Sequence, residues 1–363
     1  MREAIRCARR GIGTTHPNPR VGAVVLRGGE VAARGYHERA GLAHAETRAL
    51  EAAGSRAAGA TLVVTLEPCA HFGRTPPCTD AILEAGIRRV VVGMLDPNPL
   101  VNGRGVARLR EAGVDVAVGL REAACRALNP PYLKRLATGL PWVTLKAMVS
   151  LDGRIASDRG DSRGLGGLSE QRLVHRLRAE NDAVLIGIET ALRDDPLLTV
   201  RLVRGRQPLR VVLDDALRLP LDSRLVATTA EAPLVVATTS RDGARAAALA
   251  ARGAGVWAFD SGPDGRVPLD PLLRRLSAAG RDAVLVEGGP TVHTSFLRLG
   301  LADHVAVGIA PLLLGGAGSP SWTRDLGRDS VADGIVVEDF RVRRLGRDAW
   351  LEGRIRREGS AGV

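Results

Sequence analysis

The amino-acid sequence predicts an α/β protein of two domains. The chain has 363 residues, and at roughly 150 residues per domain this length suggests two domains that each bury a core. Apolar strands alternate with helices of about ten residues in both halves, a pattern typical of mostly parallel sheets covered by helices. Gly139 and Pro141 interrupt this pattern, so we expect the first domain to span residues 1–141 and the second residues 142–363.

The first half reads as a β-hairpin followed by alternating helices and strands. The hairpin covers residues 21–37 and turns at Gly28 and Gly29, since glycine adopts the backbone angles that tight turns require. A last helix is expected from about Glu122 to Arg135. Between them we expect helices at residues 44–54, 79–86 and 103–113 and strands at residues 60–68, 87–96 and 114–120.

The second half begins with a strand from residue 142 and repeats the alternation of strands and helices. Two strand ends resemble each other, DAVLIG at 182–187 and DAVLVEGG at 282–289. Because ligands collect beyond the carboxyl ends of strands in open α/β sheets, both turns are candidate binding loops. Residues 334–357 alternate apolar and polar side chains around a Gly-Arg-Asp turn, which predicts an antiparallel hairpin, and residues 358–363 read as a loose tail.

The composition is that of an ordinary soluble protein. Hydrophobic residues make up 45% of the chain and charged residues 25%. The opening stretch MREAIRCARRGIG carries scattered charges, and no run of about 18 apolar residues occurs, so we expect neither a signal peptide nor a membrane span. A cytoplasmic location follows, and its reducing conditions would keep the four cysteines as thiols.

The net charge of +11 could indicate a nucleic-acid ligand, and most of the excess lies in residues 1–140. The basic residues are almost all arginines, they never occur three in a row, and only 3% of the residues are aromatic. A nucleic-acid surface usually combines clustered cations with aromatic rings, so we expect an anionic small molecule rather than a polynucleotide.

Two of the four cysteines, Cys69 and Cys78, lie nine positions apart in the segment TLEPCAHFGRTPPC. His44 and Glu46 stand at the expected start of a helix. One imidazole and two thiolates give the three protein ligands that a catalytic zinc ion uses, and the fourth position stays free for water. Because residues two positions apart do not share a helix face, Glu46 would stand beside the metal water rather than bind the metal.

The combination of H-x-E with a later Pro-Cys and a second cysteine is the signature of zinc deaminases, which remove an amino group from a base. In that chemistry Glu46 carries the proton to the departing amine. Eight residues separate the two cysteines, where two are usual. In this insertion His71 and Arg74 would place positive charge beside a phosphate or sugar of the substrate. Cys7 and Cys125 lie in amphipathic helices, and we expect them in the core.

These motifs resemble the bifunctional riboflavin biosynthesis family RibD. The stretches THPNPRVGAVV, GYHERAGLAHAE, TLEPCAHFGRTPPC and DPNPLVNGRG are similar to the deaminase half of that family and span most of residues 1–140. The resemblance implies a cytidine-deaminase-like domain with three α/β/α layers. It also implies zinc ligands at His44, Cys69 and Cys78, a proton carrier at Glu46 and a contact of Asn18 with the base.

The second half resembles the reductase of the same family, a dihydrofolate-reductase-like α/β domain that uses NADPH. The stretches KAMVSLDGRIA, DAVLIGIETALRDDPLLTVR and VEGGPTVHTSFL carry the resemblance. The glycine fingerprint G-x-G-x-x-G of Rossmann domains does not follow the first strand of this half. Instead, the glycines of EGGPT lie between an expected strand and an expected helix, where backbone N–H groups and the positive helix end can hold a phosphate.

Carried over by position, the resemblance places one group of residues near the cofactor and another near the substrate. The planar guanidinium of an arginine donates two hydrogen bonds at once, which suits a substrate phosphate. The cofactor group is Val149, Thr190, Asp194, Gly289, Pro290, Thr291, Val292, His293, Thr294 and Ser295. The substrate group is Ser162, Arg178, Leu198, Arg201 and Glu287.

This half departs from the family pattern at two places. Gly164 stands where relatives carry a tryptophan, and a glycine follows where they carry a threonine, so an aromatic side chain that would face the cofactor is missing. Asp215 stands where a serine is common. Its carboxylate would repel a cofactor phosphate if it pointed toward one.

The sequence therefore predicts two consecutive steps of riboflavin synthesis. The first is deamination of 2,5-diamino-6-(5-phosphoribosylamino)pyrimidin-4(3H)-one, and the second is NADPH reduction of the ribosyl group of 5-amino-6-(5-phosphoribosylamino)uracil. The resemblance also implies a homo-oligomer formed through the reductase domain. Two alternatives stay open at this point: a deaminase whose degenerate reductase domain serves as an oligomerisation scaffold, and an RNA-binding or RNA-editing deaminase.

Overall fold

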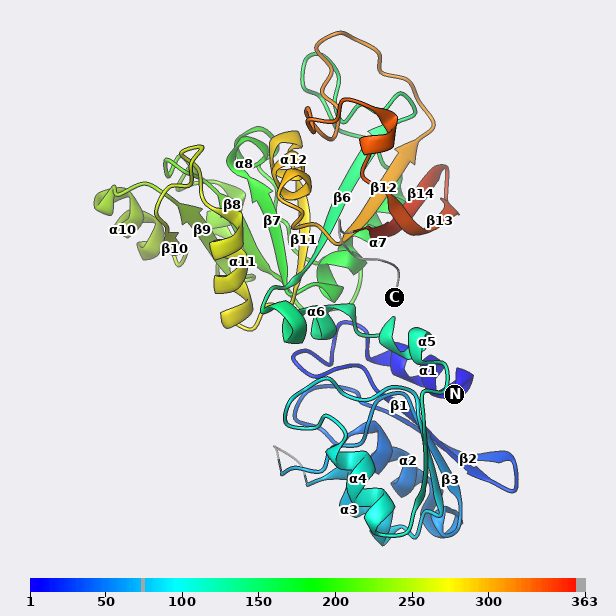
Figure 1. Ribbon diagram of the computed structural model, residues 1–363. Coiled ribbons are helices and arrows are strands. Elements are labelled where there is room, and N and C mark those ends of the chain that lie inside the picture. The colour runs from blue at the N-terminus through cyan, green and yellow to red at the C-terminus, as the bar shows by residue number, and fades with distance from the viewer. Residues whose placement is uncertain (73–75, 357–363) are drawn as a thin grey trace. The chain divides into compact units, whose positions relative to one another are not determined.

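A computed structural model describes residues 1–72 and 76–356 of the chain. The chain forms two compact units, Met1–Gly139 and Leu140–Val363 (Figure 1). Each unit builds its own sheet around its own apolar core, as the length of the chain predicts. The expected C-terminal tail lies outside the described residues.

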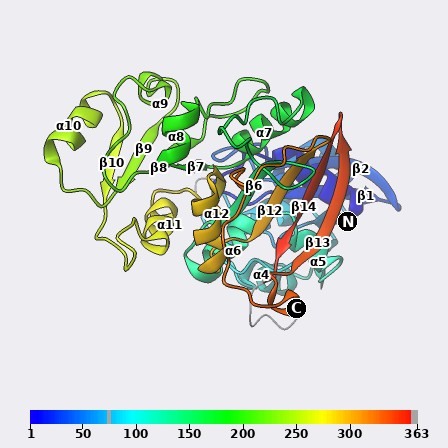
Figure 2. The same ribbon diagram turned by 90° about the horizontal axis from the view of Figure 1, so that it is seen from above.

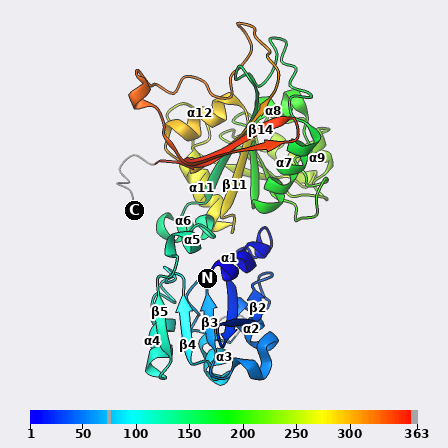
Figure 3. The ribbon, with the colours of Figure 1, turned by 90° about the vertical axis from the view of Figure 1, so that its right-hand side faces the viewer.

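The N-terminal unit contains a five-stranded mixed sheet. The expected hairpin forms and turns at Gly28 and Gly29, which both have positive φ. The expectation of a mostly parallel sheet is wrong for this unit, because the first hairpin strand lies between two others and runs against both. The order is β2-β1-β3-β4-β5, with β1 at Gly22–Arg27, β2 at Glu30–Tyr36, β3 at Thr61–Val64, β4 at Arg89–Val92 and β5 at Asp115–Val118. Figure 3 shows β3, β4 and β5 side by side and parallel.

Helices cover both faces of this sheet, which gives the three α/β/α layers that the resemblance implied. On one face Leu50, Ile82 and Leu109 join the larger core, and on the other face Ala4 packs against Val24. Cys7 and Cys125 are buried, as expected. The first face carries α2 (Ala45–Ala53), α3 (Cys78–Glu84) and α4 (Arg104–Glu111), the second α1 (Arg2–Ala8) and α5 (Glu122–Arg126), and two short 3-10 helices are η1 (Arg9–Gly11) and η2 (Gly54–Ala57).

The single helix expected from Glu122 to Arg135 is wrong. Two helices occupy this stretch, α5 and α6 (Pro130–Thr138). Pro130 and Pro131 have no backbone N–H to donate to the preceding turn, and their rings would clash with it, so the first helix cannot continue through them. Both prolines fit the first turn of a new helix, where the N–H groups have no partner within the helix.

The C-terminal unit is built on a nine-stranded sheet. Its order is β10-β9-β8-β7-β11-β6-β12-β14-β13, and Figure 2 shows it from above. The strands from β10 to β12 are parallel, and the predicted C-terminal hairpin joins them antiparallel at one edge. The strands are β6 (Trp142–Ser150), β7 (Ala183–Gly187), β8 (Leu209–Leu213), β9 (Leu234–Thr238), β10 (Gly255–Ala258), β11 (Ala283–Gly288), β12 (His304–Ala310), β13 (Val337–Leu345) and β14 (Asp348–Ile355).

Helices also cover both faces of the larger sheet. Leu272 and Phe296 pack against one face, whereas Ile188, Leu225 and Leu249 pack against the other. Among the described residues, no helix combines the length and the apolar character that a membrane crossing requires. The first face carries α11 (Leu269–Ala278) and α12 (Pro290–Arg298), the second α7 (Leu168–Glu180), α8 (Ile188–Asp194), α9 (Arg224–Ala227) and α10 (Gly243–Ala251), and η3 (Val331–Asp333) is a short 3-10 helix.

The two strands whose ends resemble each other, β7 and β11, lie next to each other and run parallel. Their N-terminal ends are joined by Asp182, whose Oδ2 accepts hydrogen bonds from the backbone N–H groups of Asp282 and Ala283 at 2.8 and 2.9 Å. Because parallel strands end at the same edge of a sheet, the turns after Gly187 and Gly288 are neighbours. This edge of the sheet carries the candidate reductase site.

Candidate active sites

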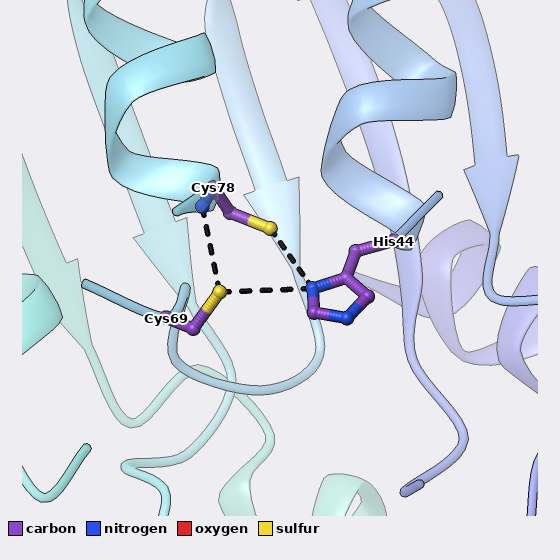
Figure 4. Close-up of side chains that lie close together, drawn as sticks. All are labelled: His44, Cys69 and Cys78. Carbon is purple, nitrogen blue, oxygen red and sulfur yellow. Dashed lines mark hydrogen bonds between the residues drawn. The ribbon is translucent and has the colours of Figure 1, made fainter. Parts of the chain in front are cut away.

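Three side chains of the N-terminal unit converge as potential zinc ligands (Figure 4). His44 is the N-cap residue of α2, Cys69 lies in the loop after β3, and Cys78 is the first residue of α3. His44 Nδ1 lies 3.2 Å from Cys78 Sγ and 3.6 Å from Cys69 Sγ. The backbone N–H of Cys78 donates to Cys69 Sγ at 3.4 Å. The fold thus brings together two cysteines that an unusually long insertion separates in the sequence.

The positions of the three donor atoms fit a zinc ion. With Zn–S bonds of about 2.3 Å and Zn–N bonds of about 2.0 Å, a sulfur and a nitrogen ligand of a tetrahedral site stand about 3.5 Å apart. The observed N···S separations of 3.2 and 3.6 Å are close to this value, and all three ligand atoms lie within 4.8 Å of one another. Imidazole and thiolate are also donors that zinc prefers.

The three groups compete for protons. Hydrogen bonding from Cys78, with a further contribution from His44, lowers the pKa of Cys69 to about 4 although burial opposes this change. The hydrogen bond to Cys69 raises the pKa of His44. The same sulfur, followed by burial, raises the pKa of Cys78. A metal ion bound here would displace these protons, so metal affinity would depend on pH.

Glu46 lies in the first turn of α2, beside the three ligands and not among them. Its side chain is buried, and burial raises the pKa of Glu46 to about 7. His44 opposes this rise, whereas Cys69 adds to it. A buried carboxyl group next to a metal site is placed to accept and return a proton during hydrolysis.

Glu67, which the sequence analysis did not single out, anchors the loop that carries the first cysteine. Its buried carboxylate accepts hydrogen bonds from the backbone N–H groups of Asp96, Gly103 and Val106 at 3.2, 2.9 and 3.1 Å. These contacts tie the cysteine loop to the start of α4. The only indication in the sequence is that Glu67 directly precedes Pro68. The backbone N–H groups that it binds lie about 30 to 40 residues away in the chain.

The predicted base contact, Asn18, lies close to the metal site through a second histidine. Asn18 Nδ2 is 3.0 Å from His37 Nε2, and His37 Nδ1 is 3.2 Å from the backbone oxygen of Ala43. The rings of His37 and His44 meet edge to face with centroids 5.3 Å apart. Burial lowers the pKa of His37, and because its Nδ1 faces the Ala43 carbonyl, its Nε2 is placed to accept the amide N–H of Asn18.

Of the two residues expected to place positive charge beside the substrate, the structure describes only His71. His71 is half-buried, and its Nδ1 atom is buried without a hydrogen bond to any described residue. Arg74 lies outside the described residues.

The C-terminal unit contains a cleft of about 260 Å³ at the edge where β7 and β11 end. The cleft is lined by residues from the predicted cofactor group and from the predicted substrate group, which are far apart in the sequence. Its lining also includes Lys146 and Glu170, which the sequence analysis did not select. The predicted residues that line it are Ser162, Thr190, Asp194, Glu287, Gly289 and His293.

Arg178 and Glu287 form a bidentate ion pair at this cleft. Arg178 Nε and Nη2 donate to the two carboxylate oxygens of Glu287 at 2.5 and 2.8 Å, and both side chains are largely buried. Burial would raise the pKa of Glu287, but Arg178 and, to a smaller extent, Lys146 lower it below its usual value. Two residues predicted to face the substrate therefore contact each other.

Leu198 and Arg201 lie in a loop that several side chains hold in place. Leu198 is buried and has a positive φ of 53°. The backbone N–H of Arg201 donates to His175 Nδ1 at 2.8 Å, and Arg201 Nη1 donates to Thr199 Oγ1 at 2.5 Å. The buried guanidinium of Arg210 donates to the backbone oxygen of Leu197 at 3.1 Å. These hydrogen bonds fix the backbone of the loop, while the side chain of Arg201 stays exposed.

The predicted cofactor residues at 289–295 form the turn after β11 and the first turns of α12. Gly289 has a φ of 80° and precedes Pro290, the first residue of the helix. His293 is buried, and its Nδ1 and Nε2 lie 3.1 and 3.3 Å from backbone oxygens. The remaining side chains form local contacts. Thr291 and Thr294 accept hydrogen bonds from Arg324, and Ser295 donates to the Thr291 carbonyl. Val292 is in the core, and Val149 is buried on β6.

The two departures from the family pattern have definite positions. Gly164 lines the cleft, has a φ of 79°, and its carbonyl accepts a hydrogen bond from Arg347 at 2.8 Å. Asp215 Oδ1 accepts a hydrogen bond from the backbone N–H of Val267 at 2.8 Å. Because this carboxylate fixes a neighbouring loop, its presence has a structural explanation within the unit.

Two family profiles match the chain, one in each half. Residues 1–94 match the cytidine and deoxycytidylate deaminase zinc-binding region. Residues 141–351 match the RibD C-terminal domain.

Relatives and solved structures extend this similarity over nearly the whole chain. The riboflavin biosynthesis protein RibD of Aquifex aeolicus is 44% identical over 96% of this chain and 95% of its own length, and that of Escherichia coli is 40% identical over 97% of both. A structure of Acinetobacter baumannii RibD superimposes with a TM-score of 0.87 at 37% identity, covering 98% of both chains.

A second solved structure carries a more detailed name. The Thermotoga maritima protein, called a diaminohydroxyphosphoribosylaminopyrimidine deaminase and 5-amino-6-(5-phosphoribosylamino)uracil reductase, matches with a TM-score of 0.83 at 36% identity, over 98% of this chain and 97% of its own. Identity at this level over the full length, with both domain profiles in the same order, places the chain in one family. The chain belongs to the RibD family of bifunctional riboflavin biosynthesis enzymes, with a zinc-binding deaminase domain followed by an NADPH-using reductase domain.

Proposed function

We propose that residues 1–141 deaminate 2,5-diamino-6-(5-phosphoribosylamino)pyrimidin-4(3H)-one and that residues 142–363 reduce the resulting 5-amino-6-(5-phosphoribosylamino)uracil with NADPH. The observation that carries the proposal is the convergence of the His44, Cys69 and Cys78 donor atoms beside the buried carboxyl group of Glu46. The substrates follow from the name of the Thermotoga maritima relative.

In the deaminase site we assign His44, Cys69 and Cys78 as zinc ligands and Glu46 as the proton carrier. A bound zinc ion would supply a hydrolytic nucleophile at neutral pH, because it lowers the pKa of a water molecule. Glu46 would accept a proton at its carboxylate and return it to the departing amine. Asn18, oriented by His37, would hold the base, while His71, and Arg74 outside the described residues, would meet the sugar phosphate.

The role of Glu46 is tested by the change Glu46→Gln. Zinc content should stay unchanged, because the ligands are intact, and ammonia release should fall by about 10² to 10⁴. Glu51→Gln is the matched control, since Glu51 lies on the same helix with its side chain exposed. Retained turnover in Glu46→Gln would remove the assigned role.

In the reductase site we assign Val149, Thr190, Asp194 and residues 289–295 to NADPH and Ser162, Arg178, Leu198, Arg201 and Glu287 to the substrate. Bound NADPH would supply the hydride. The turn at Gly289 fits a phosphate, because it lines the cleft, lacks a side chain and leads directly into α12. The chain's own contribution would be to orient the two molecules, with Arg201 available for the substrate phosphate.

Purified full-length protein should oxidise NADPH when it is mixed with the deaminated intermediate. Ammonia release from the deaminase substrate, measured in a separate assay, shows that the deaminase domain of the same preparation is active. No NADPH oxidation above background, together with normal ammonia release, would instead favour the scaffold alternative.

We also propose that the enzyme acts in the cytoplasm as a homo-oligomer formed through the reductase domain and without a nucleic-acid partner. The dispersed arginines and the scarcity of aromatic residues support the last point. Light scattering of the full chain and of the isolated reductase domain tests the oligomer. RNA affinity that falls steeply with salt would contradict the absence of a nucleic-acid partner.

A further inference from the structure

The reductase cleft contains a buried ion pair that the assignments above do not use. Lys146 Nζ lies 2.8 Å from Glu170 Oε1, and the side chains are 13% and 6% exposed. Both residues line the cleft. Buried lysine and glutamate side chains are rare because the desolvation of each charge costs free energy, so a pair at a ligand cleft needs an explanation.

The pleat of the sheet explains how Lys146 reaches this position. Leu145 and Val286 point into the core under α11 and α12. Lys146 and Glu287 point to the opposite face, because each pairs with a residue of α7, Glu170 and Arg178 respectively. Glu170 comes from the first turn of α7, which covers that face. Lys146 thus contacts the carboxylate of Glu170 and is close enough to Glu287 to help lower the pKa of that carboxyl group.

Gly166 provides the space for the Glu170 carboxylate. A β-carbon at position 166 would overlap Glu170 Oε2 and would lie 2.8 Å from its Cδ. The backbone of Gly166 does not have positive φ, so an alanine is compatible with its conformation. Since the overlapping atoms are the end of a flexible side chain, an alanine at 166 would displace the carboxylate and leave the backbone in place.

We propose that Glu170 is a positioning residue of the reductase, which holds the Lys146 ammonium at the wall of the cleft, and that Gly166 is required because it leaves room for this carboxylate. The proposal deepens the reductase function proposed above and rests on it. Without Glu170, the ammonium would turn toward Glu287. It would then compete with Arg178 for that carboxylate and disturb the bidentate pair at the cleft.

The first experiment compares Glu170→Ala, Gly166→Ala and the double variant in the full-length enzyme. We expect each single change to lower kcat/KM for NADPH oxidation with 5-amino-6-(5-phosphoribosylamino)uracil by about tenfold to a hundredfold, because small misplacements in a site have effects of this size. The double variant should be no worse than Glu170→Ala alone, because no carboxylate is left to displace. Independent, additive losses would overturn the link between positions 166 and 170.

Two control variants and one internal control accompany this comparison. Gly243→Ala introduces a β-carbon that meets no described atom within 4 Å outside its own helix backbone and chain neighbours. Glu189→Gln removes a carboxylate from an exposed ion pair with Arg218. Neither should change NADPH oxidation. Ammonia release by the other domain should stay normal in all variants. This shows that each change acts within the reductase domain, and the NMR measurement below shows whether that domain is folded in each variant.

The position of Lys146 can be followed without any activity. The chain contains only two lysines, Lys134 and Lys146, so selective ¹³C labelling of lysine side chains gives two NMR signals. Glu170→Ala and Gly166→Ala should both shift the signal of Lys146 and leave that of Lys134 unchanged. An unmoved Lys146 signal would overturn the proposal even if the wild-type enzyme reduces its substrate.

Kinetics in a Lys146→Met enzyme distinguish a positioning role of Glu170 from a purely structural one. If Glu170 acts through Lys146, Glu170→Met should have no further effect on kcat in a Lys146→Met enzyme, which keeps similar volume at both positions. If the pair only stabilises the fold, kcat and KM of the correctly folded Glu170 variants should equal the wild-type values, and the proposal would be wrong. If wild-type protein does not oxidise NADPH, the proposed function fails, whereas the NMR comparison still decides the ion pair.

Discussion

Gly105 and Pro68 lie in such close contact that a β-carbon on Gly105 would overlap the Pro68 carbonyl oxygen and would lie 3.1 Å from its carbon. This contact presses the start of α4 against the residue that precedes Cys69. Gly105→Ala should therefore displace the cysteine loop, because a backbone atom cannot move aside as a side chain can. We expect a loss of about 1–3 kcal/mol in the free energy of unfolding of the deaminase domain and reduced zinc content. Full zinc content with wild-type stability would contradict this account.

Removing one sulfur ligand should remove the metal. Cys78→Ser replaces a thiolate with a hydroxyl group that zinc binds poorly. We expect zinc affinity to fall by at least about a hundredfold, and ammonia release to fall with it. Metal analysis after dialysis against a chelator checks this expectation. Cys7→Ala, a change of another buried cysteine, should keep its zinc. A Cys78→Ser protein with full metal content would mean that a different residue binds the ion.

Breaking the pair between Arg178 and Glu287 should destabilise the reductase domain. Arg178→Met leaves a buried carboxylate without its cation, which typically costs about 3–5 kcal/mol. The double change of Arg178 and Glu287 to methionine should recover much of this loss, because no unpaired charge remains. Urea unfolding followed in the isolated domain gives the values, with Arg274→Met as the control for an exposed pair. If Arg178→Met lost no more stability than the control Arg274→Met, the pair of Arg178 and Glu287 would not behave as a buried ion pair.

His175 should make the reductase domain sensitive to mild acid. Burial, with Arg178 and Arg201, lowers the pKa of His175 to about 4, whereas Glu287 opposes this change. The unfolded chain binds the proton more readily, so this contribution to stability is complete above about pH 6.5 and is lost as the pH falls toward 4. Between pH 7 and pH 5, wild-type protein should lose about 1–2 kcal/mol more than His175→Asn.

Asparagine is chosen because its Oδ1 atom can replace His175 Nδ1 as the acceptor for the backbone N–H of Arg201. Chemical unfolding of the isolated domain at several pH values provides the measurement. If both proteins lose stability equally over this range, the neutral state of His175 is not linked to folding.

Much of the fold could be read from local patterns. The hairpin at Gly28 and Gly29, the alternation of strands and helices, and the C-terminal hairpin all depend on residues close together in the chain. Two errors arose where local signals were misread or insufficient. The prolines at 130 and 131 divide a stretch whose amphipathic pattern suggested one helix. The antiparallel pairing of β1 with β3 depends on contacts about 40 residues apart.

The candidate sites divide in the same way. His44, Cys69 and Cys78 could be selected because their chemistry is specific and their spacing resembles a known family. Lys146 and Glu170 were missed because a lysine inside an apolar strand and a glutamate in a helix have no distinctive pattern. Glu67 was missed because its partners are backbone N–H groups of a distant loop.

By itself, the sequence determined the chemistry of the deaminase site, the order of the two domains and most of their secondary structure, because these depend on residue type and on short-range periodicity. Only the tertiary structure decided which charges pair at the reductase cleft and which glycine lies against a carboxylate there. Such pairs form between strands and helices that are distant in the chain. Their energies depend on burial and on separations of a few ångströms, which no local pattern records.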